Sequence, residues 1–186
     1  MARDSAATRA RILAAAIDEF GAYGLAGARI DRIAEAAQAN KRSIYVYFGN
    51  KEALFAAAMT HIVDDISTSV PIDTDDLPDY VGRIFDYYLA NPSVVRMAMW
   101  LPLERPPQGP DETDAYAKKV AALSASGSPA NDLDASDVVM FINALAQAWF
   151  MSPDSLRAAD GLDPNSDERI ARHRAALVET VRRMCG

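Results

Sequence analysis

The sequence predicts an all-α protein of about nine helices. Apolar residues recur three and four positions apart along most of the chain, which is the helical period, and no stretch shows the alternation typical of a strand. Proline-containing breaks at residues 71–78 and 102–110 separate groups of helical segments. With 186 residues, half of them apolar, the chain can bury a core of its own.

Charge is distributed unevenly along the chain. The formal net charge is −7, yet residues 1–55 carry eight Lys or Arg against six Asp or Glu, and residues 56–186 carry eleven against twenty. Phosphate binding depends on nearby charge, because the Debye length is only about 8 Å at physiological salt. The acidic excess lies outside the N-terminal part, which predicts two regions with different roles.

Several classes of protein are disfavoured. No run of about 18 apolar residues is present to span a membrane, and the charged N-terminus lacks the apolar core of a secretory signal. The single Cys185 cannot form an internal disulfide, so we expect a cytoplasmic location. The sequence has no Gly-rich phosphate loop, Cys–His pair at useful spacing or metal-ligand cluster, so we expect no enzymatic activity, cofactor or metal.

The first helix is predicted to run from residue 4 or 5 to about residue 22. Asp4 or Ser5 can cap its start, and Gly24 is suited to a left-handed C-cap. Arg9 and Arg11, near its start, can each reach a phosphate or remain solvated, and the sequence favours neither. The residues at helical spacing that should pack on the next two helices are Ile12, Leu13, Ala16, Ile17 and Phe20.

Two short helices are predicted next, over residues 31–37 and 41–48, with three residues between them. Asn40 is a preferred N-cap for the second, in which Ile44 and Phe48 can face the core while cations point outward. A helix, a three-residue turn and a second helix that begins with cations form the geometry that places a helix in the DNA major groove. The predicted DNA-binding residues are Arg29, Asn40, Lys41, Arg42, Ser43, Tyr45, Tyr47 and Lys51.

The types of these residues suit DNA. Arg and Lys side chains can donate to guanine O6 and N7, and a tyrosine ring can pack on a thymine methyl. Ser43, Tyr47 and Lys51 can hold phosphates, and Arg29 can meet a phosphate beside the N-terminus of the helix at residues 31–37. The alternative is a small helical hairpin whose cations are simply solvated.

Three segments between Thr8 and Phe55 carry a resemblance to a known family: EFGAYG, then IDRIAEAA, then KRSIYVYFGNKEALF. In this order, and with the aromatic run at residues 45–48 followed by Gly-Asn-Lys-Glu, the region resembles the DNA-binding domain of the tetracycline-repressor (TetR) family of bacterial regulators. The family usually has Thr or Ser opening the second helix, where this chain has Ala28 and Arg29, and a small residue at position 42. Its turn usually reads Gly-Val-Ser, where this chain has Gln-Ala-Asn at residues 38–40.

The remaining chain is predicted to form helices over residues 51–70, 80–89, 94–101, 112–124, 134–151 and 167–184. Residues 102–110 contain four prolines and are predicted to be a loop, because proline is excluded from helix interiors. His61 has no neighbouring metal ligands, so we expect it to be structural. We predict a helix-turn-helix DNA-binding domain at residues 1–50 and a helical regulatory and dimerisation domain at residues 51–186.

A homodimer is predicted from the two C-terminal helices. The helix at residues 134–151 is apolar around most of its circumference and needs cover on more than one side. One short reading helix contacts few bases, whereas a two-fold pair reads a palindrome. The resemblance implies pairing through these two helices, and the alternative is a thickly buried monomer core. The predicted interface residues are Val138, Ile142, Leu145, Ile170, Leu177 and Val181.

The resemblance also implies an effector pocket among the helices from residue 80 to residue 149. Aromatic and Met side chains there suit an adaptable apolar site, although the same residues at helical spacing also suit an ordinary core. The predicted pocket residues are Tyr87, Tyr88, Met97, Trp100, Met140, Phe141, Asn143 and Trp149.

The predicted function is that of a ligand-responsive DNA-binding transcriptional regulator, with repression as the sign that the resemblance implies. Its expected partners are double-stranded DNA, a second copy of the chain and a small-molecule effector, with no membrane. Effector binding would shift the dimer between arrangements and, through the helix at residues 51–70, change the distance between the two reading helices. The alternative is a helical protein–protein adaptor that retains a vestigial DNA reader.

Overall fold

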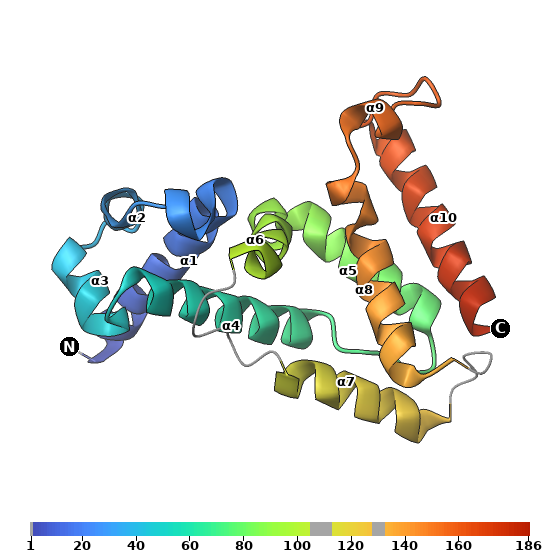
Figure 1. Cartoon of the computed structure of the whole chain (residues 1–186), viewed down its shortest axis with the longest axis horizontal. Helices are drawn as coiled ribbons and strands as arrows, with labels where there is room; N and C mark the ends of the chain where they lie inside the picture. The colour runs from blue at the N-terminus through green and yellow to red at the C-terminus, as the bar shows by residue number, and fades with distance from the viewer. Residues whose placement is uncertain (1, 105–112, 128–132) are drawn as a thin grey trace. The chain divides into compact units, whose positions relative to one another are not determined.

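The computed structural model describes residues 2–104, 113–127 and 133–186, and within these ranges helices are the only regular secondary structure (Figure 1). This confirms the predicted all-α class. Ten helices are present in the described ranges, one more than the sequence predicts. They are α1 (Ala2–Gly27), α2 (Ile30–Ala36), α3 (Lys41–Phe48), α4 (Lys51–Ser69), α5 (Leu77–Ala90), α6 (Pro92–Glu104), α7 (Thr113–Ser126), α8 (Ala135–Met151), α9 (Asp154–Arg157) and α10 (Asp167–Cys185).

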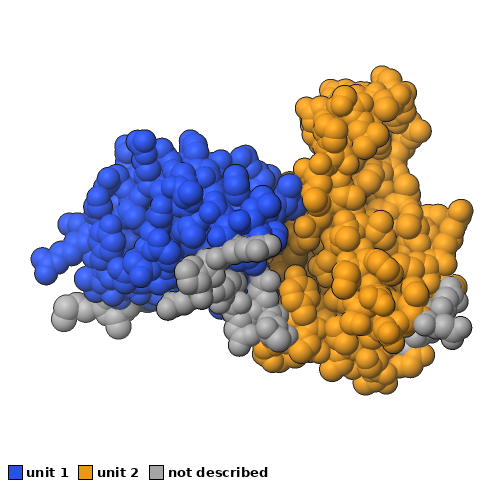
Figure 2. All heavy atoms as spheres, viewed as in Figure 1, with its two compact units in different colours: residues 1–65, 91–112 blue, residues 66–90, 113–186 orange. Residues whose placement is uncertain are grey.

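The chain divides into two compact units (Figure 2). Unit 1 comprises residues 1–65 and 91–112, and unit 2 comprises residues 66–90 and 113–186. Helix α6 therefore groups with the N-terminal helices, although it follows α5 of unit 2 after a single residue. The domain boundary between residues 50 and 51 stays a prediction, since these units describe packing.

Unit 1 has an apolar core that joins α1, α2, α3 and α4. Phe20 of α1 meets Phe55 of α4 edge to face, with 5.1 Å between ring centroids, a favourable aromatic geometry. Each large side chain buried here contributes roughly 1.5–3 kcal/mol. The largest fully buried side chains of this core are Ile12, Phe20, Ile33, Ile44, Leu54, Phe55 and Met59.

Helix α6 packs closely against the C-terminal part of α1. A Cβ added at Gly21 would lie 2.8 Å from the Ser93 carbonyl oxygen, so only glycine allows this approach. Trp100 donates from Nε1 to the Gly21 carbonyl at 3.3 Å. Gly24 interrupts α1 with φ 67° and ψ 178°. Its φ is positive, as predicted for a glycine C-cap, but its ψ lies outside the left-handed helical region and α1 continues to Gly27.

Helix α6 extends through Pro102, which the sequence placed in a loop. A proline removes one backbone donor, and Pro102 lies only two residues before Glu104, the last residue of α6, so a single hydrogen bond of the last turn is lost. The Glu104 carboxylate lies 3.4 Å from the Ala26 amide, and this contact holds the last turn of α6 against α1. The rest of the predicted loop, residues 105–110, lies outside the described residues.

Unit 2 is built around α5, which packs on α8 and α10, while α7 packs on α8. Phe85 of α5 lies at the centre, with ring centroids 6.4 Å from Trp149 and 5.4 Å from His173. Helix α5 begins earlier than predicted because Asp76 Oδ1 accepts from the Asp79 amide at 2.9 Å and caps the first turn. No helix in the described ranges is long and apolar enough to cross a membrane.

Candidate nucleic-acid interface

Helix α3 has a buried face and an exposed face, and its bounds match the prediction. Ile44 and Phe48 are buried in unit 1. Arg42, Tyr45 and Val46 lie on the opposite side, three and four residues apart, and Tyr45 is 45% exposed. Val46 is 72% exposed and was missed, although its position four residues after Arg42 places it on the same face. A cation, an aromatic ring and a small apolar group are thus presented together.

The turn before α3 is a left-handed helix C-cap. Gln38 has φ 49°, and its amide donates to the Glu35 carbonyl at 3.0 Å while the Ala39 amide donates to the Ala34 carbonyl at 2.9 Å. These two bonds form a Schellman motif, whose left-handed position favours glycine. Asn40 then caps α3 as predicted, because its Oδ1 accepts from the Arg42 amide at 2.8 Å.

The two cations at the start of α3 have different surroundings. Lys41 Nζ lies 2.8 Å from Asp31 Oδ1, and hydrogen bonding to Asp31 raises the pKa of Lys41. The Arg42 guanidinium is exposed and has no carboxylate partner among the described residues. Arg42 is therefore the cation of α3 that is free to donate to a base edge.

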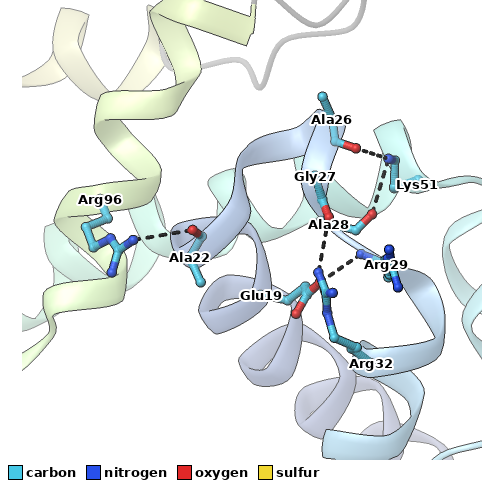
Figure 3. A network of polar contacts seen from close by, with 9 residues as sticks. All are labelled: Glu19, Ala22, Ala26, Gly27, Ala28, Arg29, Arg32, Lys51 and Arg96. Carbon is cyan, nitrogen blue, oxygen red and sulfur yellow. Dashed lines mark hydrogen bonds and ion pairs between the residues drawn. The ribbon is translucent and has the colours of Figure 1, made fainter.

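The remaining predicted contacts flank α3. Ser43 and Tyr47 are partly exposed, with the Tyr47 ring 6.3 Å from the Phe48 ring. Lys51 is partly buried, and its Nζ lies 3.4 Å from the carbonyl oxygens of both Ala26 and Ala28 (Figure 3). Lys51 thus holds the α1–α2 connection to the start of α4, a structural role that the sequence did not indicate.

Arg29 occupies the position where the resemblance led us to expect a capping Thr or Ser. It is the N-cap residue of α2, but its side chain is exposed and makes no capping bond. Glu19 of α1 takes over part of this task, since its Oε1 accepts from the Arg29 amide at 2.8 Å and from Arg32 Nε at 2.8 Å (Figure 3). The first turn of α2 is therefore held in place by a side chain of α1.

Two arginines of α1 contact the helix-turn-helix directly. Arg11 Nε donates to the Ala37 carbonyl at 3.1 Å, and the Arg9 guanidinium lies 5.2 Å from the centroid of the Phe48 ring. Both remain exposed overall. They tie α1 to α2 and α3, which the sequence left open.

The residues predicted to line an effector pocket are distributed over several places. Met97 and Trp100 belong to unit 1, where Met97 is buried and Trp100 bonds to α1. In unit 2, Tyr88 and Trp149 are buried in the core, Tyr87 is partly exposed and Phe141 is exposed. Trp100 lines a groove on α6, and Met140 and Asn143 line a separate groove of unit 2.

That groove lies between α7 and α8 and has a volume of about 340 Å³. Its wall is mainly apolar. Asn143 donates from Nδ2 to the Val139 carbonyl at 2.8 Å, which fixes the orientation of its amide. The lining residues are Tyr116, Val120, Ser136, Val139, Met140 and Asn143.

Four of the six predicted interface residues lie inside unit 2 itself: Val138, Ile142, Leu177 and Val181 are buried. Leu145 and Ile170 are partly exposed. Because α8 is apolar on most sides, its sequence does not indicate which side faces the core of its own chain. In the structure, α5 and α10 cover the side of α8 that the sequence analysis assigned to a partner subunit. The dimer stays a prediction, and the apolar surface that remains on α8 lies on other residues.

Residues 12–58 match the family described as bacterial regulatory proteins, tetR family, and residues 76–183 match the tetracyclin repressor-like C-terminal domain. The HTH-type transcriptional repressor SCO4008 of Streptomyces coelicolor is 39% identical over 167 residues, which are 86% of this chain and 87% of that protein. The HTH-type transcriptional repressor NicS of Pseudomonas putida is 38% identical over 95 residues, 47% of this chain and 45% of that one.

Solved structures show the same similarity. The transcriptional regulator SCO4942 from Streptomyces coelicolor superposes with a TM-score of 0.81 at 36% identity, covering 95% of this chain and 97% of that one. The structure of AibR in complex with isovaleryl coenzyme A and operator DNA has a TM-score of 0.66 at 15% identity, covering 93% and 97% of the two chains. At 15% identity, the similarity to AibR shows a shared fold and nothing further.

Proposed function

Since the chain belongs to the TetR family of bacterial regulatory proteins, and is therefore a ligand-responsive regulator of transcription that binds DNA, we propose that it is a dimeric repressor whose paired α3 helices read a palindromic operator. The observation that carries this proposal is the exposed face of α3, where Arg42, Tyr45 and Val46 lie together above a buried apolar face.

In the proposed docking, α3 enters the major groove. Arg42 donates to guanine O6 and N7, and Tyr45 and Val46 contact thymine methyl groups. These contacts specify sequence. Ser43, Tyr47 and Arg29 hold phosphates on either side and set the register of the helix without reading bases. Asn40 and Lys41 contribute at the α3 N-terminus, Asn40 as its cap and Lys41 through a charge that Asp31 partly neutralises.

The proposed dimer uses the apolar stripe left exposed on α8. Phe141, Ala144, Ala148 and Met151 follow one another at spacings of three, four and three residues, which is the pattern of helices packed side by side. Phe141 is 42% exposed and Met151 is 63% exposed. Ala176 and Thr180 of α10, four residues apart and exposed, add small side chains that allow a partner helix to approach.

Effector binding in unit 2 releases the operator in this proposal. A ligand that binds one arrangement of the helices better shifts the population toward it. Helix α4 begins directly after the helix-turn-helix and continues into unit 2 at residue 66. It can therefore move α3 when the helices of unit 2 rearrange. AibR, which shares the fold, holds a coenzyme A thioester together with operator DNA, and this supports a family scheme in which ligand and DNA bind one chain.

A mobility-shift assay with DNA from the promoter region of its own gene tests the proposal. We expect a retarded complex that specific DNA competes for better than random DNA, and that weakens steeply with salt. The Lys118→Ala variant, altered on the exposed face of α7, should bind like the wild type. Absence of any sequence-preferring complex would favour the alternative of a helical adaptor with a vestigial reader.

A further inference from the structure

We propose that Lys119 and the groove between α7 and α8 together bind a small amphipathic carboxylate, with its carboxylate at Lys119 and its apolar part against Tyr116, Val139 and Met140. This assignment rests on the proposed function, because it gives the chemical class of the effector to which the regulator responds.

Lys119 is a partly buried cation between two tyrosine rings. Its Nζ lies 6.0 Å from the centroid of the Tyr80 ring and 5.9 Å from that of the Tyr116 ring. An aromatic face attracts a cation but leaves its charge in place. Burial lowers the pKa of Lys119, which means that the surroundings disfavour its charged form. An anion at this position would reverse that effect.

The charge balance around Lys119 calls for a single negative charge. Arg83, the other cation near the Tyr80 ring, has its Nε 2.8 Å from Asp79 Oδ2. Lys118 has its Nζ 2.5 Å from Asp114 Oδ2. Among the described residues Lys119 alone of these three has no carboxylate within ion-pair distance. A monoanion such as a carboxylate balances the charge of Lys119, whereas a phosphate dianion would need a second cation without a carboxylate partner.

The Tyr80 hydroxyl is a second polar group without a partner. The side chain is buried, and no hydrogen-bond partner for its hydroxyl oxygen is present in the described part of the chain. Buried hydroxyls usually have one. Burial, and then the neighbouring Tyr116, raises the pKa of Tyr80 to about 12. The hydroxyl therefore keeps its proton at neutral pH and remains a donor.

Tyr116 joins the cation to the groove. Its ring packs beside Lys119 and also forms part of the groove wall, with Val120 on the same helix and Val139 and Met140 on α8. A groove of about 340 Å³ is at the small end of the range for ligand sites, roughly 300–1,000 Å³. An apolar body with one charged end fits this combination of a mainly apolar wall and a single cation.

The test compares three ligands that share an eight-carbon tail: octanoate, octan-1-ol and octyltrimethylammonium. Isothermal titration calorimetry on the full chain should show octanoate binding most tightly. Lys119→Met should weaken octanoate binding by about tenfold, since it removes a charge-assisted contact, while octan-1-ol binding stays within about twofold. Equal binding of the three ligands, or an octanoate preference that survives in Lys119→Met, would overturn the proposal.

Two further variants separate the site from general effects on folding. Lys118→Met removes the neighbouring cation on α7 and should leave binding of all three ligands unchanged. Met140→Gln, at an exposed position of the groove wall, should weaken octanoate and octan-1-ol alike, because both place the tail there. If octanoate and octan-1-ol bind to Met140→Gln as tightly as to the wild type, the tail does not lie in the groove and the proposal is contradicted. Thermal unfolding of each variant verifies that it is folded.

A mobility-shift assay in parallel distinguishes this inference from the proposed function. If the chain binds its promoter DNA and octanoate does not bind the chain, the ligand assignment is overturned and the proposed function stands. If octanoate binds in a Lys119-dependent way and the chain binds no DNA, the ligand site stands and the proposed function is overturned.

Discussion

Glu19 accepts a hydrogen bond from Arg32 Nε at 2.8 Å, and only 9% of the Glu19 side chain is exposed. The same carboxylate oxygen accepts from the Arg29 amide, so one acidic group of α1 fixes the first turn of α2. We expect Glu19→Gln to lower the free energy of unfolding by about 2 kcal/mol, because it weakens two charge-assisted bonds at a buried position. Urea denaturation measures this, and Glu35→Gln on the exposed side of α2 is the control. Equal stability of both variants would mean that the carboxylate charge is dispensable.

Gln38 has a conformation that suits glycine better. Its φ of 49° lies in the left-handed region, which costs a residue with a Cβ roughly 1–2 kcal/mol. Gln38→Gly should therefore raise the free energy of unfolding by about 1 kcal/mol. The next residue provides the comparison, since Ala39→Gly adds backbone freedom without relieving strain and should not stabilise the chain. A destabilised Gln38→Gly variant would contradict the account given for this turn.

Replacing Arg42 should change which sequences are bound. Arg42→Ala removes the proposed bidentate contact to guanine and should cost about 1–3 kcal/mol on the preferred operator, with relaxed preference at one base position. Selection of bound fragments from a random DNA pool, with wild type and variant side by side, detects this. If the base preference of Arg42→Ala is the same as that of the wild type, Arg42 does not contact a base.

Lys51 should contribute to both stability and DNA binding. Two of its three N–H donors can be directed at the carbonyl oxygens of Ala26 and Ala28, and the third can reach a phosphate. Lys51→Met should lower the free energy of unfolding by about 1 kcal/mol and reduce the slope of log affinity against log salt concentration by about 0.9. A reduced stability with an unchanged slope would restrict Lys51 to the structural role.

His173 should make unit 2 sensitive to acid. Its Nε2 is buried without a hydrogen-bond partner among the described residues, and the rings of Phe85 and Trp149 lie beside it. Burial, and then the Arg169 charge, lowers the pKa of His173 in the folded chain. The unfolded chain therefore binds the proton more readily, so stability is complete above pH 6.5 and falls as the pH drops below that value.

Urea denaturation at pH 7.5 and pH 5.5 tests this dependence. His173→Phe should lose less stability between the two pH values than the wild type does, because it keeps an aromatic ring without a titrating group. An identical pH dependence in the wild type and in His173→Phe would contradict the assignment to His173.

Charge placed on the exposed stripe of α8 should separate the proposed dimer. Phe141→Asp puts a carboxylate where an apolar partner face would lie, and an unpaired charge in such an interface is strongly unfavourable. Size-exclusion chromatography with light scattering should report a dimer for the wild type and a monomer for Phe141→Asp. Ser124→Asp on α7 should remain dimeric. A monomeric wild type would favour the single-chain core instead.

The sequence was most informative where a local signal determines local structure. The bounds of α3 follow from the Asn40 cap and from the four-residue spacing of Ile44 and Phe48, and the structure has the same bounds. Helix α9 was missed because four residues are too few to show a period. The early start of α5 was missed because Pro78 suggested a break, whereas proline is tolerated in a first helical turn.

Long-range pairings were harder to predict than helix bounds. Lys51 and Glu19 have partners on other helices, and no spacing rule identifies such partners. The side of α8 that faces its own core depends on where α5 and α10 pack, and a helix that is apolar on most sides carries no local sign of this. The groove beside Lys119 needs both α7 and α8, so its members could not be grouped from the sequence.

One residue, Asn91, separates α5 of unit 2 from α6 of unit 1. Pro92 restrains the backbone of Asn91 to extended conformations, so this connection has almost no slack. Helix α6 in turn holds α1 through Gly21 and Trp100. After α4, the backbone therefore passes between the two units again at a point where a single residue separates two helices.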